Sequence, residues 1–165
     1  MHSLYQKRLV VFVVCVFALT LSGVAQKKSA AKKSGGGAAE LNKAYLQKIW
    51  TGWESLDGTK QAEFYAKGSH LFFDVAPVKY TSFDEYSTGV SKALADYSGG
   101  KFEVNDDVEI HPMGADHAWV ASTIKSDMMK KNGKRELSTM RWTAIFQKEG
   151  GKWLIVHEHI SEPIA

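Results

Sequence analysis

The chain has 165 residues, of which 44% are apolar, 12% aromatic and 24% charged, and it contains 14 glycines, 3 prolines and a single cysteine. These values are close to globular averages and exclude a collagen, a coiled coil and a disulfide scaffold. The formal net charge is +3, yet residues 40–165 carry 15 Lys and Arg against all 18 Asp and Glu, a net charge of −3. Because this larger part of the chain is acidic, we expect no nucleic-acid partner.

The first 25 residues have the pattern of a secretory signal peptide. Two basic residues precede an uncharged run at positions 9–21, and small residues at positions 23 and 25 suit a signal peptidase. The run is shorter than a membrane span, which needs about 20 apolar residues. We therefore predict cleavage after Ala25, a secreted or periplasmic location and no membrane span in the mature form, with an uncleaved anchor as the alternative. Cys15 would leave with the peptide, so the mature chain would have no cysteine.

Residues 26–39 are predicted to form a flexible linker. They consist mainly of Lys, Gly, Ser and Ala and contain no large apolar residue. Such a segment cannot bury enough surface to offset its ordering entropy. Residues 40–165 then make one domain of ordinary size.

The first half of this domain is predicted to be mainly helical. Apolar spacing and capping residues predict three helices, at residues 40–56, 59–65 and 83–97. Thr59 would cap the second helix, and Ser82 with Glu85 has the spacing of a capping box for the third. A short strand is predicted at residues 71–75, between the second and third helices.

From residue 101 onward the pattern changes to β. Four strands are predicted, at residues 101–110, 117–129, 135–148 and 153–161. Asn132-Gly133 and Gly150-Gly151 are dipeptides that favour two-residue hairpin turns, because both turn positions need positive φ. Helices followed by an antiparallel meander indicate the α+β class.

The two predicted turns fix which residues lie opposite each other in the last three strands. Side chains alternate between the faces of a sheet, so one face would carry three cross-strand rows. These rows are Trp119, Phe146 and Ile155; Ala121, Ala144 and His157; and Thr123, Trp142 and His159. The two alanines beside His157 leave space, so we expect this face to be concave and to form a pocket over the middle row.

The opposite face would be the outer surface of the sheet. Arg141 and Glu158 would lie on it within ion-pair reach. Val120, Ile145 and Val156 would form an apolar row there. Because exposed apolar patches usually mark an interaction site, we predict a homodimer through this face.

Two segments carry a resemblance to a known family. Residues 72–86, FFDVAPVKYTSFDEY, and residues 150–163, GGKWLIVHEHISEP, together with the order of elements, resemble the SnoaL-like proteins of the nuclear transport factor 2 and ketosteroid isomerase superfamily. The resemblance implies a cone-shaped α+β domain whose three N-terminal helices pack on a curved antiparallel sheet and enclose a pocket. That superfamily includes isomerases, cyclases and dehydratases as well as binding and assembly modules, so the fold alone does not settle the function.

Asp74 is the first candidate catalytic residue. The resemblance implies that it matches the proton-abstracting aspartate of the isomerases, and a carboxylate on an apolar pocket wall can act as a general base. The alternative is that Asp74 only makes hydrogen bonds in the turn at residues 76–80. The tyrosine and carboxylic acid donors of ketosteroid isomerases have no equivalent on the predicted first helix and penultimate strand, so that particular reaction is not expected.

His157 and His159 are the other catalytic candidates, because residues two apart on a strand point to the same side and could share a proton. The alternative is a structural role inside the core. Two histidines do not make a metal site, so neither a metal nor a cofactor is predicted. Tyr80, Trp119, Ala121, Trp142, Ala144 and Phe146 are predicted to contact the ligand, with core packing as their alternative role.

The sequence has no glycine-rich phosphate loop, no Gly-x-Ser-x-Gly and no HExxH motif, which excludes the common nucleotide, α/β-hydrolase and zincin classes. The leading hypothesis is an exported pocket protein for a small apolar or carbonyl-bearing molecule, either a simple binder or a cofactor-free isomerase, cyclase or dehydratase. The alternative is a non-catalytic dimerisation or protein-interaction module with a closed pocket.

Overall fold

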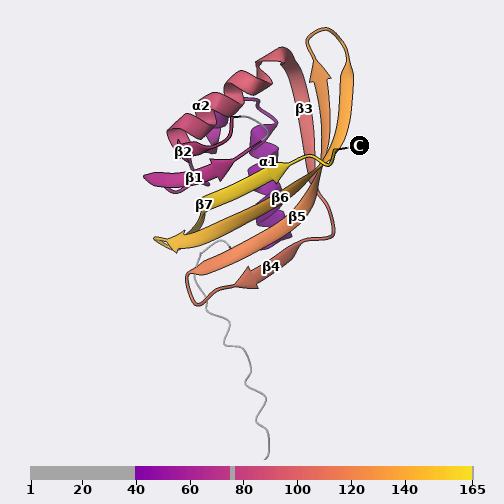
Figure 1. Cartoon of the computed structure of the whole chain (residues 1–165). Helices are drawn as coiled ribbons and strands as arrows, with labels where there is room; N and C mark the ends of the chain where they lie inside the picture. The colour runs from indigo at the N-terminus through magenta and orange to yellow at the C-terminus, as the bar shows by residue number, and fades with distance from the viewer. Residues whose placement is uncertain (1–39, 75–76, 165) are drawn as a thin grey trace, which may run out of the picture. The chain divides into compact units, whose positions relative to one another are not determined.

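Two α-helices and a seven-stranded sheet make up the part of the chain that the computed structural model describes, residues 40–74 and 77–164 (Figure 1). In chain order the elements are α1 (Lys43–Trp53), the 3₁₀ helix η1 (Gly58–Gln61), β1 (Ser69–Phe73), β2 (Tyr80–Ser82), α2 (Phe83–Ala93), the 3₁₀ helix η2 (Leu94–Asp96), β3 (Tyr97–Val104), β4 (Glu109–Pro112), β5 (His117–Lys130), β6 (Arg135–Glu149) and β7 (Lys152–Ser161). The predicted signal peptide and linker lie outside the described residues and stay predictions.

The sheet is mixed rather than purely antiparallel. Its strand order is β2-β1-β7-β6-β5-β3, and β4 also pairs with β5. β1 runs parallel to β7, with Leu71 opposite His157 and Phe73 opposite His159, which corrects the predicted antiparallel sheet at this edge. A hairpin forces two strands to be antiparallel, but the whole of α2 and the meander separate β1 from β7, so no turn constrains the direction of β1.

The described residues contain two α-helices in place of the predicted three. α1 begins after Asn42, whose side chain accepts a hydrogen bond from the amide of Tyr45, and α2 begins after Ser82. The predicted second helix is shortened to η1, which is capped by Asp57 rather than by Thr59. It cannot continue to Tyr65, because the backbone there is extended and forms a parallel bridge with Ile155 of β7.

The predicted capping box at α2 is half formed. The Ser82 hydroxyl accepts a hydrogen bond from the amide of Glu85 at 3.3 Å. The Glu85 carboxylate reaches back one residue further than predicted and accepts from the amide and hydroxyl of Thr81, at 2.9 and 2.7 Å. Both contacts satisfy donors near the helix N-terminus, so the start of α2 is well defined by the sequence.

The hairpin between β5 and β6 has a three-residue loop, where a two-residue turn was predicted. The amide of Lys130 donates to the carbonyl of Lys134 at 2.8 Å, and Gly133 has φ 86°. Hairpins of this length commonly place a glycine in the left-handed region at the end of the loop. The additional loop residue shifts the register by one, so Trp119 lies opposite Ile145 rather than Phe146.

The hairpin between β6 and β7 has the predicted two-residue turn. Glu149 pairs with Lys152 around Gly150 and Gly151, whose φ angles are 55° and 84°. Further along, however, Phe146 pairs with Ile155 while Ile145 pairs with His157. Val156 is therefore the additional residue of a β-bulge, and from this point onward each side chain of β7 lies on the face opposite to the predicted one.

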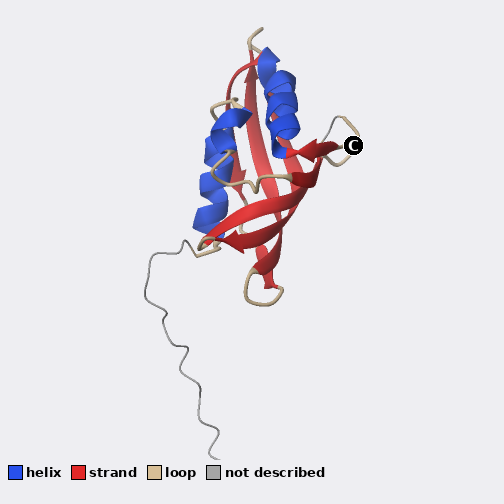
Figure 2. Cartoon of the chain, turned by 90° about the vertical axis from the view of Figure 1, so that its left-hand side faces the viewer, coloured by secondary structure: helices blue, strands red, loops and turns tan. Residues whose placement is uncertain are grey.

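These two shifts decide which side chains the sheet presents to α1 and α2, the two helices drawn in blue in Figure 2. The inner face carries Val120, Ile124, Ala144 and Glu158, all at most 1% exposed. The predicted outer apolar row is therefore wrong for Val120, and the predicted ion pair of Arg141 with Glu158 does not form. Arg141 instead donates to the backbone oxygen of Glu162 at 3.2 Å.

Candidate functional site

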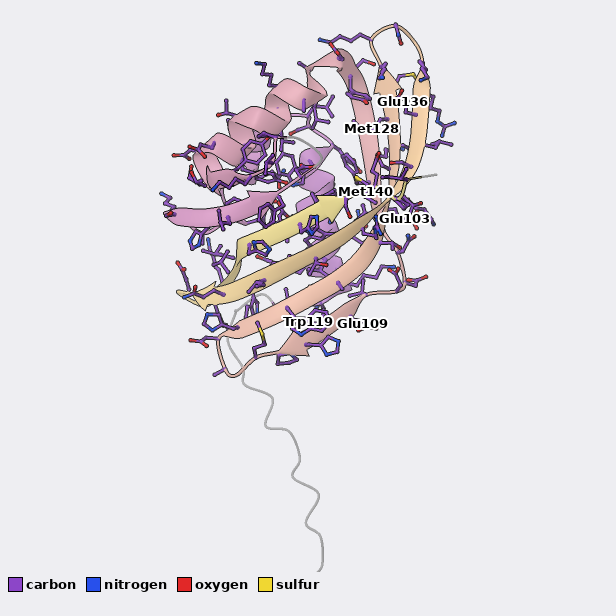
Figure 3. All side chains as sticks on the ribbon, viewed as in Figure 1. Glu103, Glu109, Trp119, Met128, Glu136 and Met140 are labelled. Atoms are coloured by element: carbon purple, nitrogen blue, oxygen red, sulfur yellow. The ribbon has the colours of Figure 1, made fainter. Side chains whose placement is uncertain are left out.

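A cavity of about 310 Å³ lies between the helices and the inner face of the sheet. Five aromatic rings, two methionines and two acidic side chains contribute to its wall: Trp50, Trp53, Tyr86, Tyr97, Phe102, Met128, Met140, Asp74 and Glu162. Met128 and Met140 come from β5 and β6 (Figure 3). The cavity is thus mainly apolar with a few polar groups, which is the usual composition of a small-molecule site.

α1 and α2 supply two walls of this cavity. α1 buries Leu46, Ile49, Trp50 and Trp53, which recur at helical spacing. The rings of Trp50 and Trp142 meet edge to face with centroids 5.5 Å apart, and those of Trp53 and Tyr86 do so at 5.7 Å. Edge-to-face packing of rings stabilises such a wall, so the cavity has a fixed aromatic lining on the helix side.

Behind this wall lies Glu158, a buried carboxyl group on β7. The hydroxyl of Tyr65 donates to its Oε1 at 2.7 Å, and the indole Nε1 of Trp142 donates to its Oε2 at 2.9 Å. The hydroxyl of Tyr86 forms a further hydrogen bond with this carboxyl, but its single proton is donated to Asp74. Tyr65 and Trp142 therefore donate to one oxygen each of a side chain that is 1% exposed.

The pKa of the Glu158 carboxyl is shifted toward neutral pH, so the group keeps a proton in weakly acidic solution. Burial raises its pKa from the ordinary value of 4.5 to about 7, although its three hydrogen bonds oppose the rise. Burial outweighs them because a charged carboxylate loses its hydration in a low-dielectric interior. The same burial, together with the negative charge of Glu158, raises the pKa values of Tyr65 and Tyr86 well above 10, so both phenols stay protonated as donors.

Asp74 is connected to this buried group through Tyr86. The hydroxyl of Tyr86 lies 3.4 Å from Oδ2 of Asp74, and both residues contribute to the cavity wall. Asp74 directly follows β1, which ends at Phe73 rather than at the predicted residue 75. Glu158, Tyr86 and Asp74 thus form a continuous chain of polar groups from the core to the cavity.

Four of the predicted site residues lie on the outer face of the sheet. On β7, His157 pairs with Ile145 of β6 and His159 pairs with Thr143. On β5, at the other side of β6, Trp119 pairs with Ile145 and Ala121 pairs with Thr143. His157 Nδ1 is 2.7 Å from the carbonyl oxygen of Leu71. The predicted pocket over Ala121, Ala144 and His157 is therefore wrong, because the loop at Gly133 and the bulge at Val156 turn Ala121 and His157 away from the helices.

The other predicted ligand residues face inward but belong to the packed core. Trp142, Ala144 and Phe146 are at most 1% exposed, and Tyr80 is 6% exposed. Trp142 contacts Glu158 through its indole nitrogen. Tyr80 packs against the helix residue Gly89, where an added Cβ would approach its ring to 2.3 Å. The inward placement of Trp142, Ala144 and Phe146 is as predicted, while any contact of these residues or of Tyr80 with a ligand stays a prediction.

Sequence reasoning missed Glu158, Tyr65 and Tyr86. Glu158 stands between two histidines, and strict alternation along β7 assigns it to the solvent face. The bulge that turns it inward is not accompanied by a glycine or proline, so the sequence offers no local signal for it. Tyr65 ends the predicted helix at residues 59–65, Tyr86 lies in the predicted helix at residues 83–97, and neither is among the predicted site residues.

Across residues 40–74 and 77–164, no three His, Cys, Asp or Glu side chains gather closely enough to bind a metal ion. None of the helices in these ranges has the length and apolar character needed to cross a membrane.

Comparison with known proteins identifies the family. The sequence matches the SnoaL-like domain over residues 43–165, and the chain therefore belongs to the SnoaL-like family. Its fold is that of the nuclear transport factor 2-like superfamily, as expected from the two segments at 72–86 and 150–163. A search of curated proteins finds no significant match.

Several solved structures share the fold. A proposed calcium/calmodulin dependent protein kinase II association domain from Xanthomonas campestris has a TM-score of 0.66 at 24% identity, covering 81% of this chain and 93% of its own. A nuclear transport factor 2-like protein from Salmonella enterica has a TM-score of 0.65 at 16% identity, covering 74% and 92%. A proposed scytalone dehydratase from Novosphingobium aromaticivorans has a TM-score of 0.65 at 10% identity, covering 73% and 80%.

The raised pKa of Glu158 predicts a specific dependence of stability on pH. Between about pH 4.5 and 7 the folded protein keeps a proton on Glu158 that the unfolded chain releases, so the free energy of unfolding falls as pH rises. We expect Glu158→Gln to remove this decline, which is on the order of 3 kcal/mol. Urea unfolding at pH 5, 6, 7 and 8 measures it.

Glu149→Gln is the matched control for this experiment, because Glu149 is exposed at the end of β6. It should leave the decline between pH 5 and 7 unchanged. A parent protein whose free energy of unfolding is constant over this range would contradict the assignment of a proton to Glu158.

Proposed function

We propose that this SnoaL-like protein binds a small, largely apolar molecule in the cavity, and that Asp74 and Tyr86 contact the polar group of that molecule. The observation that carries this proposal is the position of the Tyr86 hydroxyl, 3.4 Å from Asp74 and hydrogen-bonded to the buried Glu158. A mainly apolar cavity in which a few polar groups converge is a typical ligand site.

The same groups are suited to cofactor-free proton transfer. The carboxylate of Asp74 would accept a proton from a C–H or O–H group of the ligand as a general base. Protonated Glu158 would donate to Tyr86, and the Tyr86 hydroxyl would turn its proton from Asp74 to a ligand oxygen that gains negative charge. One proton leaves the ligand and one is delivered to it, which is the balance that an isomerase, a cyclase or a dehydratase requires.

The second candidate function is a non-catalytic association module. It is favoured by the similarity to a proposed kinase association domain and by apolar side chains on the outer face. The volume of about 310 Å³ favours the ligand-binding function, because it reaches the range of about 300 to 1,000 Å³ that is typical of ligand pockets.

The ligand-binding proposal predicts that protein purified from its own host retains a small molecule. Native mass spectrometry should detect it, and Asp74→Asn and Tyr86→Phe should each lower its occupancy about tenfold, because each removes a polar contact. Tyr45→Phe is the control for Tyr86→Phe, since the Tyr45 hydroxyl binds the carbonyl of Trp153. Equal occupancy in all variants would contradict the proposed contacts, and a parent protein that binds nothing would favour the association module.

A homodimer through the outer face of the sheet is proposed as well. Leu71 is 45% exposed on this face, and Phe73, Trp119 and Ile145 are half-buried there. Ile145→Lys should convert the dimer to a folded monomer, whereas Thr139→Lys, at an exposed position on the same face of β6, should leave it intact. Sedimentation velocity at about 50 µM, well above the dissociation constant of a specific dimer, measures this. A parent protein that is already monomeric under these conditions would refute the dimer.

Export is proposed from the sequence of residues 1–25 alone. The basic start, the apolar run and the small residues before the linker predict that the exported protein begins at Gln26. The intact mass of protein recovered from the periplasm or the medium should lack residues 1–25. A mass that includes them would refute cleavage, and a lipid adduct would indicate that Cys15 is retained.

A further inference from the structure

The charge of the cavity wall restricts the ligands that it can accept. Asp74 and Glu162 are the charged side chains among the described lining residues, and both are acidic. None of those lining residues is Lys, Arg or His. An anionic ligand would therefore meet like charges in a partly desolvated space, where their repulsion is strong.

The negative charge of Asp74 also acts on the groups around it. It contributes to the raised pKa values of Tyr65, Tyr80 and Tyr86, and to that of Glu158. These groups belong to four different elements or loops, and Tyr86 is the one among them that lines the cavity. The negative potential of Asp74 therefore extends through this region, where a positive charge would be stabilised.

The aromatic lining adds a second attraction for cations. The rings of Trp50 and Phe102 lie with centroids 5.4 Å apart at an angle of 52°, and those of Trp53 and Tyr86 lie at 75°. Tilted rings present faces in several directions, and the negative face of an aromatic ring attracts ammonium groups. The polarisable sulfur atoms of Met128 and Met140 complete an adaptable apolar wall.

Two basic side chains of the protein approach this region from outside. The ammonium group of Lys130 lies over the ring of Tyr97, 5.6 Å from its centroid, and pairs with Glu136 at 2.9 Å. Arg141 donates to the backbone oxygen of Glu162 rather than to its carboxylate. Lys130 shows that a ring of the lining already accepts a cation, and its own charge is balanced by Glu136.

We propose that the cavity binds a lipophilic organic cation, an amine or quaternary ammonium group carried on a hydrocarbon frame. This inference rests on the proposed ligand-binding function and names the class of its ligand. The ammonium group would lie between the aromatic rings and the carboxylates of Asp74 and Glu162, and the hydrocarbon part would contact the methionines. A neutral molecule of the same shape would gain the apolar contacts and lose the electrostatic ones.

Three probes of similar size test this proposal: benzyltrimethylammonium, its neutral carbon isostere neopentylbenzene, and the anion phenylacetate. Quenching of the tryptophan fluorescence at pH 7.5 and isothermal titration calorimetry measure their binding to the full-length protein. We expect the cation to bind about tenfold more tightly than the isostere, and the anion to bind most weakly.

Two variants locate the charge that gives this preference. Asp74→Asn and Glu162→Gln should each reduce the ratio of cation to isostere affinity by about threefold or more, while Glu149→Gln, which removes a negative charge far from the cavity wall, should leave it unchanged. Glu162 is exposed, so its variant is expected to fold even where Asp74→Asn does not.

The outcomes separate this inference from the proposed function. If the isostere or the anion binds as tightly as the cation, the proposed ligand class is wrong while ligand binding in the cavity stands. If the cation is preferred equally by the parent protein and both cavity variants, the preference arises elsewhere and the inference is overturned. If none of the three probes binds, the proposed function and this inference both fail.

Discussion

The burial of the Glu158 carboxyl group is the constraint on which the inner half of this domain depends. A buried carboxyl without partners would be strongly destabilising, so its two oxygens must be met by donors from elsewhere in the chain. Tyr65, between η1 and β1, and Trp142 of β6 supply them, and the hydroxyl of Tyr86 of α2 forms a further hydrogen bond with the carboxyl. The Glu158 side chain thereby connects β7 with β6, α2 and the loop before β1, which are distant in sequence. Its hydrogen bonds fix the positions of the Tyr65 and Tyr86 hydroxyl groups.

Two local irregularities of the sheet decide which side chains face the helices, and the second of them turns Glu158 inward. The three-residue loop ending at Gly133 sets the pairing of β5 with β6, and the bulge at Val156 sets the pairing of β6 with the end of β7. Side chains alternate along a strand, so a shift of one residue exchanges the two faces. The bulge turns His157 and His159 to the outer face and gives the inner face a carboxyl in place of an imidazole.

This explains which parts of the fold and site could be predicted from the sequence. Helix α1, the start of α2 at Ser82, the α+β class and the turn at Gly150 follow from local patterns, because each depends on residues within a few positions. Asp74 could be placed because it ends a strand before a turn, and the family resemblance assigns that position to the pocket. The faces of β5 and β7 could not, because the first depends on the length of the loop at Gly133 and the second on a bulge at Val156 that no local residue signals.

The arrangement also separates two functions that this fold can serve. The inner face holds the acidic chain from Glu158 through Tyr86 to Asp74 and the aromatic cavity, whereas the outer face carries Trp119, Ile145 and the two histidines. Ligand contact and subunit contact would therefore use opposite surfaces of the same strands. A substitution such as Ile145→Lys can remove association without altering the cavity wall, and Asp74→Asn can alter the cavity without touching the outer face. Because β5, β6 and β7 each contribute residues to both faces, a shift of any of these strands would couple the ligand to assembly.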